Sequence, residues 1–333
     1  MDATRRKLTF GVTSSLCTTL LPAIAQQSLI PFRVGMAAPS NTFLALWMAH
    51  DAGFYQNNGL DFSIYDMVGG AEAGPTLSSG TIQLMHIGLS SVIRANNSGA
   101  NLRVIGSLSN VVRFTLFAKP GITKVEELKG STFGISSPGS ESDVTIDIGL
   151  EKLGLTRKDI LIKDVGSGGQ RLAAVKSGSV AAATLNEPYR TQAFELGLKP
   201  LVDLVPERTP WLFSGLVADA RYIQSNRNTL LSFLKATIEG NYLAVSDQDR
   251  GKTTLAKALK INDSKVLELS YRDFQQQSPL NAVATPEAAR ANIARVAQPG
   301  AKTNIDAYCD LTLTDELQKQ GFFESMKSKY KIG

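Results

Sequence analysis

The sequence predicts an α/β protein built from two lobes, and three features of the chain lead to this prediction. Between residues 32 and 205, short segments of strand character are interleaved with segments of helical spacing. After residue 220 the spacing is helical throughout. Two strand-like segments, 114–119 and 211–220, stand where the chain would pass from one lobe to the other and back. These features together predict two α/β lobes joined by two crossings that act as a hinge.

The first hundred residues after the N-terminal segment alternate strands and helices. Residues 32–37 have strand character, and Ser40 is placed to cap a helix over 41–52, which Gly53 ends. Further strands are expected over 61–67, 82–88, 102–107 and 114–118, and further helices are expected to open at Gly69-Gly70 and at Ser90-Ser91.

The middle of the chain repeats the same order. Thr123 and Glu126 have capping-box spacing at the start of a helix. A strand over 132–136 is expected to deliver the turn Ser137-Pro138-Gly139-Ser140 to a helix over 142–153. Backbone N–H groups at such a turn can bind a polar or anionic group. Next come a strand at 160–164, a helix at 170–177, a strand at 179–185 and a helix at 189–195.

The last third of the chain has helical spacing. Helices are expected over 225–245, 252–259, 263–274, 286–296 and 315–327. We therefore assign residues 28–116 and 218–333 to the first lobe, with a helical C-terminal tail, and residues 117–217 to the second lobe.

The N-terminus has the pattern of an export signal. Arg5-Arg6-Lys7 precede a moderately apolar run over 8–21, and Ala23-Ile24-Ala25 has the form of a cleavage site. The run is too short to span a bilayer. We expect residues 1–25 to be a signal peptide that is removed after Ala25, which places the mature protein in the periplasm. The arginine pair favours the twin-arginine route, and the ordinary secretory route is the alternative.

Composition narrows the class of protein. The full chain has a net charge of +5, and residues 1–25 hold three basic residues and one acidic residue, which leaves +3 for the mature chain. The mature chain has no basic run, so we expect no nucleic-acid partner. A hydrophobic content of 43% is enough for ordinary cores. Cys309 is the single cysteine outside the signal segment, so no internal disulfide is expected and Cys309 should be buried.

Patterns of catalytic residues are mostly missing from the sequence. His50 and His86 are far apart in apolar contexts, and no His/Cys spacing suits a metal. Residues 88–92 lack the second glycine of a nucleophile elbow, and residues 69–76 lack the lysine of a phosphate-binding loop. We therefore expect no catalytic residue, no cofactor and no metal.

Several segments, in their order and spacing, carry a family resemblance over nearly all of the mature chain. They are Leu44–Tyr55 with Asn58-Gly59-Leu60-Asp61, Gly69-Gly70, Ser79-Gly80, Ile87-Gly88, Lys119-Pro120-Gly121-Ile122, Glu127-Leu128-Lys129-Gly130 and Gly178-Ser179-Val180-Ala181-Ala182. With them the chain resembles the periplasmic substrate-binding proteins of the nitrate/sulfonate/taurine class of ABC importers, a family that also includes thiamine-pyrimidine synthases. The resemblance implies the type II periplasmic binding protein fold, closure of two lobes on a small ligand, and a membrane permease as partner of a monomer.

The resemblance also implies that the pocket is built from turns at strand ends and from the hinge. The predicted ligand-binding residues are Ser40, Asn41, Gly69, Gly70, Ser90, Ser91, Phe114, Ser137, Gly139, Ser140, Asn186, Glu187, Tyr189 and Trp211. Phe114 and Trp211 could stack on a flat ligand or pack in a core. Arg94 and Arg113 are nearby cations for which we expect a surface position.

Acidic residues limit the ligand. Glu141 and Asp143 complement the dipole of the helix that follows Ser140, and with Glu187 they would repel a strongly charged anion such as nitrate or sulfate. We expect an organic sulfonate or carboxylate, with an aromatic body as one form. The alternative is a pyrimidine heterocycle paired with Glu187. An enzyme like the thiamine-pyrimidine synthases is less favoured, since that chemistry implies a His- and Cys-rich iron site.

Overall fold

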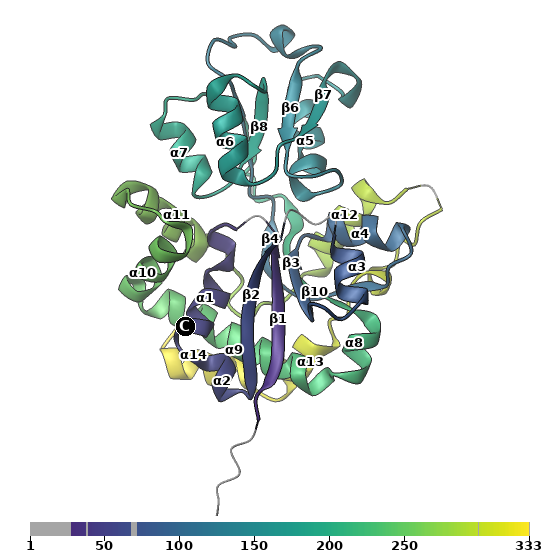
Figure 1. Cartoon of the computed structure of the whole chain (residues 1–333), viewed down its shortest axis with the longest axis vertical. Coiled ribbons are helices and arrows are strands. Elements are labelled where there is room, and N and C mark those ends of the chain that lie inside the picture. The colour runs from purple at the N-terminus through teal and green to yellow at the C-terminus, as the bar shows by residue number, and fades with distance from the viewer. Residues whose placement is uncertain (1–27, 38, 68–71, 299, 333) are drawn as a thin grey trace, which may run out of the picture.

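The computed structural model describes residues 28–37, 39–67, 72–298 and 300–332. Its chain forms two α/β lobes, a larger one that contains both ends of the described chain and a smaller one built from the middle (Figure 1). The α/β fold predicted from the sequence is thereby confirmed. The predicted signal peptide and both Gly69 and Gly70 lie outside the described residues.

The larger lobe is organised around a five-stranded sheet in the order β2-β1-β3-β10-β4. Its strands are β1 (Ile30–Ala37), β2 (Leu60–Met67), β3 (Leu84–Ile87), β4 (Leu102–Val111) and β10 (Pro210–Asp219). β1 runs parallel to β2 and β3, whereas β10 runs antiparallel to β3 and β4. A strand from late in the sequence is therefore inserted between two early strands.

The smaller lobe has a second five-stranded sheet in the order β7-β6-β8-β5-β9. Its strands are β5 (Thr115–Ala118), β6 (Thr132–Ile135), β7 (Leu161–Asp164), β8 (Ala182–Leu185) and β9 (Pro200–Asp203). β6 is parallel to β7 and β8, and β5 is antiparallel to β8 and β9. The chain passes between the sheets after β4 and again before β10.

Helices cover both sheets. Those of the larger lobe are α1 (Leu44–Asp51), α2 (Phe54–Asn57), α3 (Ala73–Ser78), α4 (Leu89–Asn97), α8 (Ala220–Ser225), α9 (Arg227–Ser246), α10 (Gln248–Leu259), α11 (Ser264–Gln277), α12 (Pro286–Val296), α13 (Thr312–Lys319) and α14 (Phe322–Tyr330). Those of the smaller lobe are α5 (Glu141–Lys152), α6 (Gly168–Ser177) and α7 (Tyr189–Glu195). Short 3-10 turns occupy Asn41–Phe43, Val125–Leu128, Arg157–Asp159 and Ile305–Ala307. None of the helices in the described ranges is both long and apolar enough to cross a membrane.

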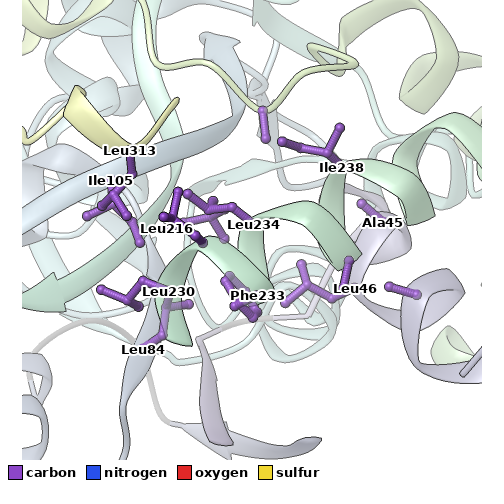
Figure 2. Packing of buried hydrophobic residues seen from close by; sticks show 14 of the residues in the cluster. Ala45, Leu46, Leu84, Ile105, Leu216, Leu230, Phe233, Leu234, Ile238 and Leu313 are labelled. Carbon is purple, nitrogen blue, oxygen red and sulfur yellow. The ribbon is translucent and has the colours of Figure 1, made fainter. Parts of the chain in front are cut away.

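Helix α9 is the centre of the main core (Figure 2). Its apolar residues recur at helical spacing, so Leu230, Phe233, Leu234 and Ile238 face the sheet together. They are buried with Leu216 of β10 and with other strand residues. Cys309 is also buried, as the sequence predicted.

Three local predictions are corrected by the structure. Ser40 makes no capping bond, because its hydroxyl pairs with the Thr42 hydroxyl at 2.9 Å and the chain enters α1 through a 3-10 turn. Thr123 bonds Glu127 and not Glu126. The expected helix over 315–327 is two helices, because Gly321, with a φ of 72°, reverses the chain between α13 and α14.

Candidate functional site

A small cavity lies between the two lobes, with a volume of about 70 Å³. Its walls are Ala37, Ser40, Thr42, Phe43, His86, Ile87, Gly88, Ser91, Phe114, Ser136, Ser140, Glu141, Ser142, Arg171, Asn186, Phe213 and Ser214. These residues lie near the ends of strands and the starts of helices in both lobes. A buried water needs about 10–15 Å³, so the cavity can hold a few waters or a small molecule.

The structure brings five of the residues predicted from the sequence to this cavity. They are Ser40, Ser91, Phe114, Ser140 and Asn186. Ser140 belongs to a cluster in which its hydroxyl bonds those of Ser136 and Ser142, each at 2.8 Å. Asn186 follows β8 directly, as the predicted strand end required.

Seven other predicted residues do not line the cavity. They are Asn41, Ser90, Ser137, Gly139, Glu187, Tyr189 and Trp211. The Asn41 amide donates to the Ser270 carbonyl at 2.8 Å and to Asp273 at 2.7 Å, which holds the 3-10 turn before α1 against α11. Gly139 N–H donates to Asp143 at 2.7 Å, so the turn before α5 uses this amide internally.

Glu187 is buried where the smaller lobe meets α11 of the larger lobe. Its carboxyl accepts from the Thr191 hydroxyl at 2.9 Å and from the Thr191 amide at 3.2 Å. Burial raises the pKa of this carboxyl, with a smaller contribution from nearby Asp273. Oε2 also accepts from the Ser270 hydroxyl of α11 at 3.4 Å, so residues of both lobes contact this carboxyl.

Glu141 lies in the cavity wall and was not among the predicted ligand residues. The sequence suggested that it would stay near its own helix terminus, whereas its carboxyl reaches across to the larger lobe. It accepts from the Ser90 amide at 2.8 Å, from the Ser90 hydroxyl at 2.9 Å and from the indole N–H of Trp211. Burial raises the pKa of Glu141 to about 7, against the lowering effect of these donors.

Arg171 is the second residue of the site that sequence reasoning missed. It is 2% exposed, and its guanidinium donates to the carbonyls of Thr184 and Gly166 at 3.0 and 2.8 Å. Its Nη2 bonds no acceptor within the residues that the structure describes. Burial lowers the pKa of Arg171 to about 10, so the group is a cation at neutral pH. A basic residue in the first turn of a helix opposes the helix dipole, and this was the available signal in the sequence.

The two other arginines named near the site differ in burial. Arg94 is exposed, as expected. For Arg113 the expectation of a surface position is wrong, because it is 2% exposed and pairs with Asp273. The crossing from β4 to β5 buries this side chain against α11.

His86 completes the cavity wall from β3. Its ring centroid lies 3.8 Å from that of Phe43, and burial lowers its pKa to about 3, so the imidazole is neutral. Nε2 is buried without a hydrogen-bond partner among the described residues. Within the same residues, no group of three or more His, Cys, Asp and Glu side chains is placed to hold a metal ion.

The chain is similar to known proteins in its sequence. A family model described as NMT1/THI5 like matches residues 40–250. A Brucella abortus (strain 2308) protein, named as a candidate binding protein, is 22% identical over 257 residues, which cover 76% of this chain and 79% of that protein.

Solved structures are similar as well. The alkanesulfonate-binding protein SsuA from Xanthomonas axonopodis pv. citri, bound to MOPS, is 18% identical and has a TM-score of 0.67, over 80% of this chain and 91% of the other. The nitrate-binding protein NrtA from Synechocystis PCC 6803, which is periplasmic, is 15% identical with a TM-score of 0.67, over 88% of this chain and 89% of the other. These likenesses confirm the two-lobed binding-protein fold predicted from the sequence.

Proposed function

The chain belongs to the NMT1/THI5-like family, and we propose that it is a periplasmic solute-binding protein that delivers a small organic acid to the permease of an ABC importer. The two-lobed fold, shared with sulfonate- and nitrate-binding proteins, supports this proposal. The export signal predicted for residues 1–25 supports a periplasmic location. We propose a monomer without enzymatic activity.

The observation that carries the ligand class is the buried guanidinium of Arg171. A buried cation without an acidic partner is costly, and the cost falls when an anion arrives. Arg171 lines the cavity, and both carbonyls that it contacts leave Nη2 available. A carboxylate or sulfonate matches the planar fork of a guanidinium. The acidic group of the ligand therefore goes to Arg171.

The rest of the cavity suits an uncharged body. Phe43, Phe114 and Phe213 contribute aromatic surface, and the serine cluster at the start of α5 contributes hydroxyls. Arg171 already lies 5.8 Å from the centre of the Phe114 ring. Glu187, the partner suggested for a pyrimidine heterocycle, is absent from the cavity wall, so that alternative gains no support.

A binding screen tests the proposal. The chain from Gln26 is screened by thermal shift against sulfonates, aromatic and aliphatic carboxylates, nitrate and pyrimidines, since a ligand of the native state raises the melting temperature. We expect shifts with organic acids. Shifts confined to pyrimidines, or a catalytic turnover of any of them, would overturn the assignment.

Substitution of Arg171 then tests the site. R171Q should weaken binding of the best acid about tenfold or more, because a charged hydrogen bond contributes about 1.5–3 kcal/mol. R190Q is the matched control, since Arg190 is bound to Asp203 at 2.7 Å and lies outside the cavity wall. It should leave the dissociation constant within about threefold. Equal effects of the two substitutions, measured by calorimetry, would remove Arg171 from the site.

A further inference from the structure

The N-terminus of α4 presents a set of hydrogen-bond donors to the boundary between the lobes. The Ser90 amide belongs to the first turn of this nine-residue helix, where N–H groups lack partners within the helix. The Ser90 hydroxyl lies beside it and accepts from the Asn292 amide at 3.0 Å, which directs the hydroxyl proton outward. The indole N–H of Trp211 points to the same place from β10. Three donors of the larger lobe thus converge where a helix N-terminus favours negative charge.

The group that occupies this position is the carboxyl of Glu141, which belongs to the smaller lobe. Its Oε1 accepts from the Ser90 amide, and its Oε2 accepts from the hydroxyl and the indole. The carboxyl approaches the backbone of Gly88 so closely that a methyl group on Gly88 would overlap it. Since Gly88 has a φ of −79°, the glycine is required here by space and not by backbone conformation.

The Asn292 side chain connects this contact to the C-terminal helices. Its Oδ1 accepts from the Leu212 amide at 2.7 Å, and its amide nitrogen fixes the Ser90 hydroxyl. Elements from α4, β10 and α12 therefore surround one carboxyl of the other lobe. Surface ion pairs between Arg295 and Glu151 at 2.5 Å and between Lys265 and Glu195 at 2.7 Å also join the lobes, but they are exposed and contribute little.

We propose that Glu141 is an internal carboxylate ligand, which fills the anion position at the start of α4 and holds the two lobes together without help from a bound solute. The external ligand then supplies one acidic group, at Arg171, and none at α4. This last statement about the solute rests on the proposed function. The internal contact does not, because it needs no solute.

Chemical rescue with acetate tests the contact. The chain from Gln26, free of added solute, carries Glu141→Ala, which removes the carboxyl and leaves its donors in place. At about pH 8 the wild-type carboxyl is ionised, since its pKa is near 7. We expect the melting temperature of the variant to fall by several degrees and to rise again, with saturation, as acetate is added to tens of millimolar. The variant should respond more strongly than wild type, because the carboxyl of wild type fills the position at α4, whereas any acetate that binds at Arg171 stabilises both proteins alike.

Glu151→Ala is the matched control, since it removes an exposed carboxyl that also spans the lobes. It should melt close to wild type and show the same response to acetate as wild type. Equal acetate responses of the two variants, or an unchanged melting temperature for Glu141→Ala, would overturn the proposal. The proposed function fails independently if no organic acid binds wild type.

A milder variant keeps the test valid if Glu141→Ala does not fold. Glu141→Gln fills the same space but presents amide hydrogens to donors. We expect small-angle X-ray scattering to give a larger radius of gyration for the solute-free variant than for wild type, because the lobes separate. An unchanged radius would contradict the proposal.

Discussion

The His86 imidazole gives the protein a defined sensitivity to mild acid. Its pKa is about 3 in the native state and 6.5 in a model compound, because burial disfavours the charged form. Between these values the unfolded chain binds a proton that the native chain does not, so the free energy of unfolding falls as the pH falls below 6.5. The shift of the pKa leads us to expect a loss of about 2 kcal/mol by pH 5 from this residue.

Urea unfolding at pH 7 and pH 5 measures this loss. Wild type should lose more stability than H86Q over the same interval, since glutamine does not titrate. Glu141 works in the opposite direction, because its raised pKa makes its contribution fall as the pH rises through 7, but this contribution is common to both proteins. Identical pH dependences for wild type and H86Q would exclude the imidazole as the cause.

At the level of single residues, the sequence indicated which strand ends line the cavity better than it indicated the contacts of the long side chains. Ser40, Ser91, Ser140 and Asn186 follow strands, and strand ends meet at one edge of a sheet, so their placement could be predicted. The direction of a long side chain could not. From the sequence we expected Glu141 to stay at the start of its own helix and Glu187 to contact the ligand. Whether either side chain reaches the other lobe depends on how the two lobes meet, which the local sequence does not contain.

Among the elements, α9 depends on close packing at one glycine. A Cβ at Gly240 would overlap the Ala45 carbonyl and would lie 2.8 Å from the Ala49 amide nitrogen of α1. Gly240→Ala should therefore destabilise the protein by about 1–3 kcal/mol, although alanine favours a helix by about 1 kcal/mol. Thermal and urea unfolding measure the change.

Gly74 in α3 is the control for this prediction. A Cβ there would meet the Ala100 Cβ at 3.4 Å, an ordinary contact. Gly74→Ala should leave stability unchanged or raise it by up to about 1 kcal/mol. If both substitutions shift the unfolding midpoint in the same direction, close packing of α1 and α9 does not decide the effect.

The order of strands and helices was largely predictable, because hydrophobic periodicity reports which face of an element is buried. The boundaries were less so. Gly321 sits inside a run of helical spacing, and a glycine within such a pattern is compatible with either a continuous helix or a break. The left-handed conformation at Gly321 follows from the way α13 and α14 pack on α9, which the local sequence does not contain.

For the whole molecule, the Cys309 thiol can report on opening of the fold. It is 5% exposed, it lies in a core cluster with Val104 and Tyr308, and burial raises its pKa to about 12. A thiol reacts as the thiolate, so the native protein should resist Ellman's reagent. In the chain from Gln26 we expect labelling only as fast as the core opens, and a bound organic acid should slow it further.

One result of this labelling experiment would contradict the prediction. Rapid labelling of the folded protein, at the rate seen in denaturant, would mean that the cluster around Cys309 opens freely. C309S should show no labelling, because Cys309 is the single cysteine of the chain from Gln26.

The position of β10 between β3 and β4 also has a consequence for biosynthesis. All strands of the smaller sheet have been made once residue 203 is added. The larger sheet lacks β10, which lies between β3 and β4, until residue 219. In a nascent chain the sheet of the smaller lobe can therefore be complete while the sheet of the larger lobe is not. Until β10 is made, the edges of β3 and β4 that pair with it remain unpaired. The contacts that join them are distant in sequence and form slowly. Ribosome-bound chains should thus expose their first strands to chaperones until α9 has emerged.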